Sequence, residues 1–267
     1  MSQTFKGKTI AVTGGGSGIG AAICEALARH GAAVAVFDIH LANARSVAER
    51  IGGSAFRVDV TDEKQVAAAY ASLDALHGSV NCAGFNHISP IVATKLEDWR
   101  KMTAVHLDGA FLNVRAAARR MIGDSVGGAI VNIASINGFY GHRGMSGYAS
   151  GKAGVTMLTR IAALELASSG IRVNAVAPGI VETELTRPVM SEPETARRWV
   201  SRIPLARLGQ PDDIADIVVF LLGQGSRWIT GQTLLADGGA SLRVEPVVTD
   251  DAMWSSSALA RAATTTL

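Results

Sequence analysis

The chain has 267 residues, 48% of them apolar, and a formal net charge of +2 at pH 7. A chain of this length and composition can bury one large hydrophobic core. Lysine and arginine are scattered rather than clustered, which disfavours nucleic acid and anionic membranes as partners. We find neither a signal-peptide core nor the roughly 18 uninterrupted apolar residues of a membrane span, so we expect a cytoplasmic protein.

Two cysteines, Cys24 and Cys82, lack the spacing of zinc ligands and are too few to form a disulfide framework. We expect both to be reduced thiols packed as small hydrophobic side chains. The sequence therefore predicts no metal site.

Short runs rich in valine and isoleucine alternate with longer segments of helical spacing along most of the chain. This alternation predicts an α/β fold, a doubly wound parallel sheet of Rossmann type with about seven strands and helices on both faces. Asp62 and Pro211 are plausible helix starts. The expected strands are Thr9–Val12, Ala32–Phe37, Ala55–Val58, Ala129–Ile133, Ile171–Val176 and Thr233–Leu235, and the expected helices are residues 18–30, 41–51, 62–77, 97–121, 147–169 and 211–223.

Three segments depart from the alternation inside an expected single domain of residues 1–240. Residues 73–84 contain hardly any apolar run, which predicts a short fourth strand or a local deletion. Residues 180–205 are a partly charged insertion where a lid over a pocket would lie. Residues 241–267 form a C-terminal tail, interpreted either as a loosely ordered terminus or as a segment that docks through Trp254 on a neighbouring subunit or the pocket.

A glycine-rich turn, Thr13-Gly-Gly-Gly-Ser-Gly-Ile-Gly20, lies between the first expected strand and the first expected helix. Glycine lets the backbone turn sharply and approach a ligand closely, and the free N–H groups of a helix start favour a pyrophosphate. Because a dinucleotide site requires this strand-turn-helix context, the motif predicts cofactor binding rather than a simple tight turn.

Asp38 ends the second expected strand. A carboxylate there can accept hydrogen bonds from the ribose hydroxyls of NAD and would repel the 2′-phosphate of NADP. Neither Ser17 nor Ile39 supplies a cation for that phosphate, so we expect NAD as the cofactor. The alternative is that Asp38 only caps the following helix.

Further motifs follow in order: Asp59-Val60, NCAG at 81–84, Ser135, YASGK at 148–152, PGIVET at 178–183 and DGG at 237–239. Together with the glycine turn, they resemble the short-chain dehydrogenase/reductase family over about residues 5–240. The resemblance implies hydride transfer between a nicotinamide cofactor and a small-molecule alcohol or ketone. It also implies a homotetramer in which helices near 97–121 and 147–169 pack between subunits.

The site residues that the resemblance implies follow these motifs position by position. The catalytic set would be Ser135, Tyr148 and Lys152. The cofactor would be bound by Gly14, Ser17, Gly18, Ile19, Gly20, Asp38, Asp59, Val60, Asn81, Gly84, Tyr148, Lys152, Pro178, Gly179, Ile180 and Thr183.

Tyr148 and Lys152 are four residues apart in an expected helix and would share one face. A phenol titrates near about pH 10 in water, but an ammonium one helical turn away, helped by oxidised nicotinamide, favours the phenolate. We therefore expect Lys152 to acidify Tyr148, which would take the alcohol proton as hydride leaves for the nicotinamide. Ser135 would hydrogen-bond the same substrate oxygen.

His106 departs from the family pattern, because members usually carry an asparagine here that helps to hold a water in the proton path behind the lysine. We hypothesise that His106 does the same through an imidazole nitrogen, which would add to the relay a group titrating near about pH 6.5. The alternative is a packed or hydrogen-bonded histidine that leaves the relay unchanged or impaired.

Polar side chains after the catalytic serine, among them Asn137 and His142, suggest a hydroxylated or anionic substrate that Ser135 and Tyr148 would also contact. The favoured reading is an NAD-dependent dehydrogenase of a small polyhydroxylated, sugar-acid or cyclic secondary alcohol. One alternative is a 3-oxoacyl-thioester reductase using NADPH, which Asp38 disfavours. Another is a non-catalytic nucleotide-binding sensor, which the intact catalytic set disfavours.

Overall fold

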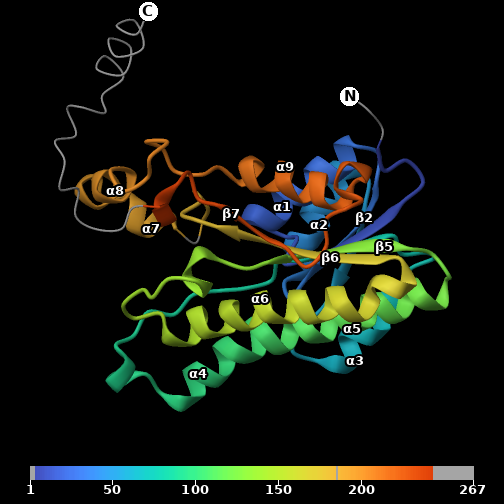
Figure 1. Cartoon of the computed structure of the whole chain (residues 1–267), viewed down its shortest axis with the longest axis horizontal. Coiled ribbons are helices and arrows are strands. Elements are labelled where there is room, and N and C mark those ends of the chain that lie inside the picture. Colours follow the sequence, from blue (N-terminus) through green and yellow to red (C-terminus); the bar gives the residue numbers. More distant parts are fainter. Residues whose placement is uncertain (1–3, 185, 243–267) are drawn as a thin grey trace, which may run out of the picture.

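The computed structural model describes residues 4–184 and 186–242, and these build a seven-stranded parallel sheet between two helical layers (Figure 1). The strand order is β3-β2-β1-β4-β5-β6-β7, so the chain adds strands first on one side of β1 and then on the other. The predicted doubly wound sheet is confirmed. Its strands are β1 (Thr9–Thr13), β2 (Ala33–Asp38), β3 (Ser54–Arg57), β4 (Gly78–Asn81), β5 (Gly128–Ile133), β6 (Ile171–Pro178) and β7 (Thr233–Ala236).

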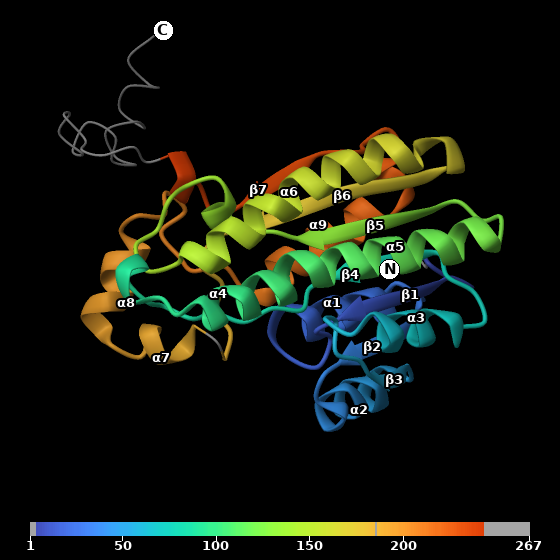
Figure 2. The same ribbon diagram turned by 90° about the horizontal axis from the view of Figure 1, so that it is seen from below.

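Helices cover both faces of the sheet (Figures 1 and 2). Side chains alternate between the two faces of a strand, so each strand contributes residues to the hydrophobic cores on both faces of the sheet. In β1, Ile10 and Val12 join the core beneath α1 and α9, whereas Ala11 joins the core on the opposite face. One layer consists of α1 (Gly18–Arg29), α2 (Leu41–Ile51) and α9 (Pro211–Leu222), and the other of α3 (Glu63–Ala71), α5 (Gly109–Gly123) and α6 (Ser146–Leu166).

Strand β4 is the short fourth strand that the sequence suggests. Its four residues are all buried although the run is not aliphatic. The polarity of Ser79 is satisfied inside the core, because its hydroxyl lies 2.7 Å from that of Tyr70 on α3. A buried polar side chain with such a partner is tolerated, so the strand does not need a run of aliphatic residues.

Two expected helices differ from the structure. The helix expected at 62–77 ends at Ala71, where the Ser72 hydroxyl donates to the Ala69 carbonyl, and Leu73 and Leu76 then pack into the core from an irregular segment. The helix expected at 97–121 is interrupted. It consists of α4 (Leu96–Thr103), a π-helical turn (Ala104–Asp108) and α5.

Both predicted helix starts are confirmed. Asp62 precedes α3, and its carboxylate accepts the backbone N–H groups of Lys64 and Gln65. Pro211 is the first residue of α9, behind a reciprocal capping box between Gln210 and Asp213. Both devices satisfy N–H groups that a helix start leaves without partners.

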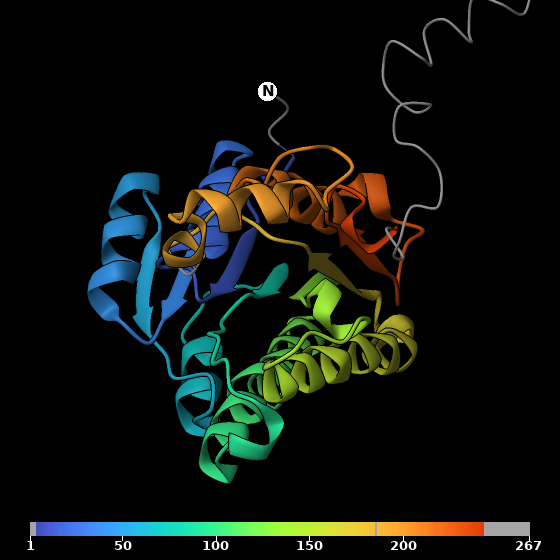
Figure 3. The same cartoon turned by 90° about the vertical axis from the view of Figure 1, so that its left-hand side faces the viewer.

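The insertion at 180–205 contains two short helices, α7 (Arg187–Met190) and α8 (Pro193–Val200), which lie at one end of the molecule (Figures 1 and 3). Trp254 and the rest of the tail from residue 243 lie outside the described residues. Within 4–184 and 186–242, none of the helices has the length and hydropathy that crossing a membrane requires. Short 3₁₀ turns complete the fold at Ile91–Ala93, Ile136–Gly138, Ala167–Ser169, Gln224–Ser226 and Ala240–Leu242.

Candidate active site

The glycine turn follows β1, where the order of the strands reverses between β1 and β4. The Thr13 hydroxyl accepts the N–H groups of Cys82 and Ala83 at 3.1 and 3.3 Å and so joins the ends of the two strands. Gly14 adopts φ +63°, and a Cβ there would lie 2.7 Å from the Ala83 Cα. The turn therefore depends on glycine for both its conformation and its close approach to the neighbouring strand.

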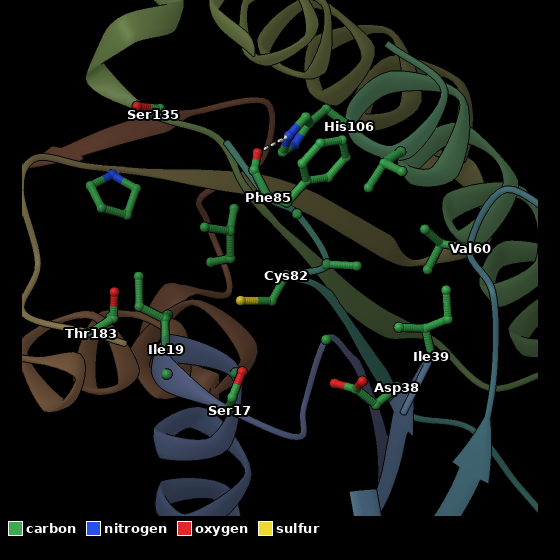
Figure 4. A pocket seen from close by; sticks show the side chains of 18 of the residues that line it. Ser17, Ile19, Asp38, Ile39, Val60, Cys82, Phe85, His106, Ser135 and Thr183 are labelled. Carbon is green, nitrogen blue, oxygen red and sulfur yellow. Dashed lines mark hydrogen bonds between the residues drawn. The ribbon is translucent and has the colours of Figure 1, made fainter. Parts of the chain in front are cut away.

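The N-terminus of α1 is open to an anion. Ser17 precedes the helix without a side-chain capping bond, and the first turn contains no acidic residue. Ser17 and Ile19 face the same groove in Figure 4. Unpaired N–H groups and the positive end of the helix dipole are the features that bind a phosphate group.

The groove encloses about 570 Å³ and is lined by most of the expected cofactor residues. Two expected residues are not among those lining it: Ile180, and Asn81, whose amide nitrogen instead donates to the Asn132 side chain at 2.7 Å. The expected cofactor residues in the lining are Gly14, Ser17, Gly18, Ile19, Gly20, Asp38, Asp59, Val60, Gly84, Tyr148, Lys152, Pro178, Gly179 and Thr183.

Asp38 is buried at the end of β2, on the side of the groove away from Ser135 (Figure 4). One carboxylate oxygen accepts the N–H of Gly16 at 3.0 Å, and the other accepts the N–H of His40 at 2.9 Å. The carboxylate thus ties the glycine turn to the start of α2. Each oxygen has a further lone pair with which to accept a hydroxyl proton.

The expected catalytic residues come from two neighbouring elements and line one groove. Ser135 follows β5, and Tyr148 and Lys152 lie on α6. The Lys152 ammonium donates to the Ile133 carbonyl at 2.6 Å and lies 5.8 Å from the centroid of the Tyr148 ring. Burial lowers the pKa of Lys152 to about 8, close to the value that a group exchanging protons near neutrality needs.

Burial raises the pKa of the Tyr148 phenol, and a hydrogen bond with Ser135 opposes this shift without reversing it. The pKa of Tyr148 is therefore shifted in the direction opposite to the expected acidification by Lys152. The physical reason is that removal of water penalises the phenolate more than the neighbouring groups favour it.

His106 is buried in the π-helical turn and contacts both Phe85 and Tyr148. Its Nε2 lies 2.7 Å from the Phe85 carbonyl oxygen, and because a carbonyl only accepts, Nε2 carries the proton. The imidazole stacks on the Phe85 ring at 5.8 Å and meets the Tyr148 ring edge-on at 4.9 Å between centroids. Nδ1 has no hydrogen-bond partner among the described residues.

The histidine fits because two glycines leave room for it. A Cβ at Gly84 would lie 2.6 Å from the imidazole Cε1, and a Cβ at Gly151 would lie 3.0 Å from the His106 Cβ. Burial and the Lys152 charge lower the pKa of His106 to about 3. The hypothesis that His106 titrates near about pH 6.5 is therefore wrong, because the enclosed ring stays neutral at physiological pH.

The sequence analysis did not anticipate several residues of the lining. Phe85 directly follows the NCAG motif, so that adjacency could have identified it. Cys82 faces the groove in Figure 4, and burial raises the pKa of its thiol to about 11, which keeps it protonated. Further unexpected lining residues include Ile39, His40, Asn43, Lys101 and Val105, whereas Glu184 and Thr186 come from the insertion that was expected to lie over a pocket.

The expected substrate residues Asn137 and His142 are not part of the groove lining. The Asn137 amide donates to the Met145 sulfur at 3.1 Å, and its backbone N–H donates to the Ser135 hydroxyl oxygen at 3.1 Å. The His142 ring stacks instead on Trp199 of α8. Asn137 thus contacts Ser135 through its backbone, whereas His142 contacts the insertion.

The fold and this groove define a dinucleotide-binding oxidoreductase. A family profile described as enoyl-(acyl carrier protein) reductase matches residues 14–241. The chain belongs to the short-chain dehydrogenase/reductase family, whose members bind a nicotinamide cofactor.

Relatives in this family act on different substrates. The chain is 39% identical over 251 residues to L-rhamnose 1-dehydrogenase (NAD(P)(+)) of Azotobacter vinelandii, which covers 89% of this chain and 98% of that protein. It is 36% identical over 245 residues to human (3R)-3-hydroxyacyl-CoA dehydrogenase, covering 85% and 93%. A gluconate 5-dehydrogenase of Burkholderia cenocepacia, solved with NADP and tartrate, superposes with a TM-score of 0.86 at 33% identity, covering 91% and 98%.

Two glycines with the same backbone strain allow a matched test of the turn. Gly14 and Gly52 have φ +63° and +65°, but a Cβ would meet Ala83 at Gly14 and nothing within 4 Å at Gly52. We expect Gly14→Ala to weaken binding of the reduced nicotinamide cofactor at least tenfold, and Gly52→Ala to leave it within about twofold. Left-handed strain costs each variant about 1 kcal/mol of stability, and the collision with Ala83 adds to this cost only in Gly14→Ala. Fluorescence titration and urea unfolding measure the two effects, and unchanged affinity in Gly14→Ala would contradict this account.

The neutral His106 predicts a pH effect on stability rather than on the active site. Unfolded histidine binds a proton below about pH 6.5, whereas folded His106 does so only near pH 3, so stability is lost as pH falls between these values. Below pH 6, we expect the free energy of unfolding of the native protein to fall by up to about 1.4 kcal/mol more per pH unit than that of His106→Asn. Above pH 8, the unfolding free energies of the two proteins should change with pH in parallel. Urea unfolding from pH 5 to 9 measures this, and parallel curves throughout would show that the folded imidazole titrates normally.

Proposed function

We propose that this protein is an NAD-dependent dehydrogenase that interconverts a small secondary alcohol, polyhydroxylated, sugar-acid or cyclic, and its ketone. The observation that carries the proposal is the convergence of Ser135, Tyr148 and Lys152 on the groove that begins at the glycine turn. A proton-transfer group, a hydrogen-bond donor for the substrate oxygen and a phosphate-binding helix start are the parts that this reaction requires.

In the oxidative direction, the Tyr148 oxygen accepts the hydroxyl proton of the alcohol while the Ser135 hydroxyl donates a hydrogen bond to the same substrate oxygen. A bound nicotinamide would supply the acceptor for the hydride of the carbinol carbon and, in its oxidised form, a positive charge. Burial alone favours the neutral phenol, so Tyr148 needs a further cationic influence to work as a base. In the reductive direction, the protonated phenol serves directly as the acid.

Lys152 has two functions in this proposal. Its ammonium is held by the Ile133 carbonyl, at the end of the strand that leads to Ser135, and this contact fixes the amine beside Tyr148. With a pKa of about 8, it can also pass a proton onward near neutral pH. His106 contributes differently: its neutral ring packs against Tyr148, and its free Nδ1 lone pair can accept a hydrogen bond from a water behind the lysine.

Asp38 supports NAD as the cofactor. Its buried carboxylate stands where the ribose of the adenosine would lie, and the neighbouring lining residues Ile39, His40 and Asn43 include no lysine or arginine. The relatives do not decide the choice, since their names include both NAD(P)(+) and bound NADP.

A second candidate substrate class is a 3-hydroxyacyl or 3-oxoacyl thioester. The 36% identity to human (3R)-3-hydroxyacyl-CoA dehydrogenase favours it. The similarity to L-rhamnose 1-dehydrogenase and to a gluconate 5-dehydrogenase favours the smaller polar alcohol.

We further propose a cytoplasmic homotetramer, with residues 1–240 as the catalytic domain, 241–267 as a tail, and no nucleic acid or membrane partner. Exposed apolar side chains on one stripe of α6 support the assembly: Met157, Ile161 and Leu164 are 52%, 47% and 82% exposed. Residues three and four apart share a helix face, so this stripe suits packing against another subunit.

A substrate panel with Tyr148→Phe tests the reaction. Purified protein is given polyols, aldonic acids, cyclic alcohols and hydroxyacyl thioesters with NAD, and reduced nicotinamide is followed by absorbance. We expect turnover of a small hydroxylated compound, a loss of at least about 100-fold in kcat for Tyr148→Phe, and little change for the exposed control Tyr140→Phe. NADH affinity should stay within about twofold. A sensor would give no turnover with any alcohol and lose nothing in Tyr148→Phe.

Asp38→Asn tests the cofactor. It removes the charge but keeps an oxygen for one of the two N–H groups, whereas Asp212→Asn removes a charge from an exposed carboxylate and serves as the control. We expect kcat/KM to favour NAD over NADP at least tenfold in the native protein, and this ratio to fall several-fold only in Asp38→Asn. Equal use of both cofactors by the native protein would contradict the choice of NAD.

A further inference from the structure

The insertion contains a segment, residues 187–202, that we call the flap, and both of its ends are fixed. Before it, the Thr186 hydroxyl donates to the Val181 carbonyl at 2.6 Å. After it, Ile203 is only 5% exposed, and the Leu205 N–H donates to the Gly238 carbonyl at 3.1 Å. Hydrogen bonds and burial thus hold the chain on both sides of the flap.

In the flap, Trp199 of α8 stacks on His142, with 5.6 Å between ring centroids and 15° between planes. His142 belongs to the loop between Ser135 and Tyr148, so the stack joins the flap to the chain segment that connects two reacting groups. That loop has its own support, because the Ser89 N–H donates to the Gly144 carbonyl at 2.9 Å. The flap therefore contacts a loop that is itself held in place by a backbone hydrogen bond.

The charged side chains of α8 are more exposed to solvent than Trp199. The side chains of Arg197 and Arg198 are 76% and 80% exposed, and both pair with Glu194 of the same helix. Trp199 is half-buried. The helix thus directs an aromatic side chain toward the catalytic loop while its charged side chains pair with each other.

We propose that Trp199 and His142 determine which substrates this enzyme accepts. The stack fastens the flap to the loop that connects Ser135 to Tyr148. The fastened flap then encloses a compact alcohol and shields it from water, whereas an acyl thioester with a long carrier arm must separate the two rings to react. This inference rests on the proposed function and adds to it a size limit set by two residues that do not line the groove.

Trypsin digestion of the full chain tests the closure without any substrate. We compare the initial cleavage rates after Arg197 and Arg202 in the native protein, Trp199→Ala, His142→Ala and the double variant, with fragments identified by mass. Because one aromatic pair is broken in each, we expect every variant to be cleaved about two- to tenfold faster, and the double variant no faster than either single one.

Two controls define the role of the stack. Trp199→Phe keeps an aromatic face and should restore native cleavage rates. Trp228→Ala removes a tryptophan that is 97% exposed and lies outside the flap, and it should change nothing. Unchanged rates in Trp199→Ala and His142→Ala, or additive effects in the double variant, would overturn the closure.

The specificity is measured as the ratio of kcat/KM for the best small alcohol to that for a 3-hydroxyacyl-CoA. We expect Trp199→Ala and His142→Ala to lower this ratio at least threefold, through a higher KM for the small alcohol and a higher kcat/KM for the thioester, with KM for NAD unchanged and the ratio restored in Trp199→Phe. Faster trypsin cleavage with an unchanged ratio would overturn the size limit. If the native protein oxidises no small alcohol, the proposed function fails, and digestion still decides the closure.

Discussion

The site depends on the contact between the ends of β1 and β4. The Thr13 hydroxyl holds the backbone of Cys82 and Ala83, and Gly14 lies so close to Ala83 that no side chain fits between them. This contact fixes the glycine turn in front of α1 and, through the same segment, places Phe85 against His106. The phosphate end and the catalytic end of the groove are therefore set by one junction.

Burial determines the electrostatics of the catalytic end. It lowers the pKa values of Lys152 and His106 and raises those of Tyr148 and Cys82, so each of these groups is shifted toward its neutral form. A groove that disfavours isolated charge strengthens every charge interaction made within it. A cation that enters this site would therefore favour the phenolate of Tyr148 more strongly than the same cation would in water.

Patterns of several residues in the sequence predicted the fold and most of the groove. The strand-turn-helix context of the glycines, the carboxylate at Asp38 and the four-residue spacing of Tyr148 and Lys152 each encode a local geometry. The end of α3, the π-helical turn and the neutral state of His106 were not predictable in this way, because they depend on burial and on contacts between distant segments. The contact of His142 with Trp199 is another example, since it joins a loop to a helix more than 50 residues further along the chain.

The close fit around His106 has an evolutionary consequence. The imidazole occupies space that Gly84 and Gly151 leave free, and the wide π-helical turn accommodates its bulk. An alanine at position 84 would meet the imidazole ring and demand a smaller side chain at position 106, such as an amide, whereas an alanine at 151 would press on the Cβ that both side chains share. Positions 84 and 106 should consequently covary among homologues, with histidine at 106 confined to lineages that keep glycine at 84.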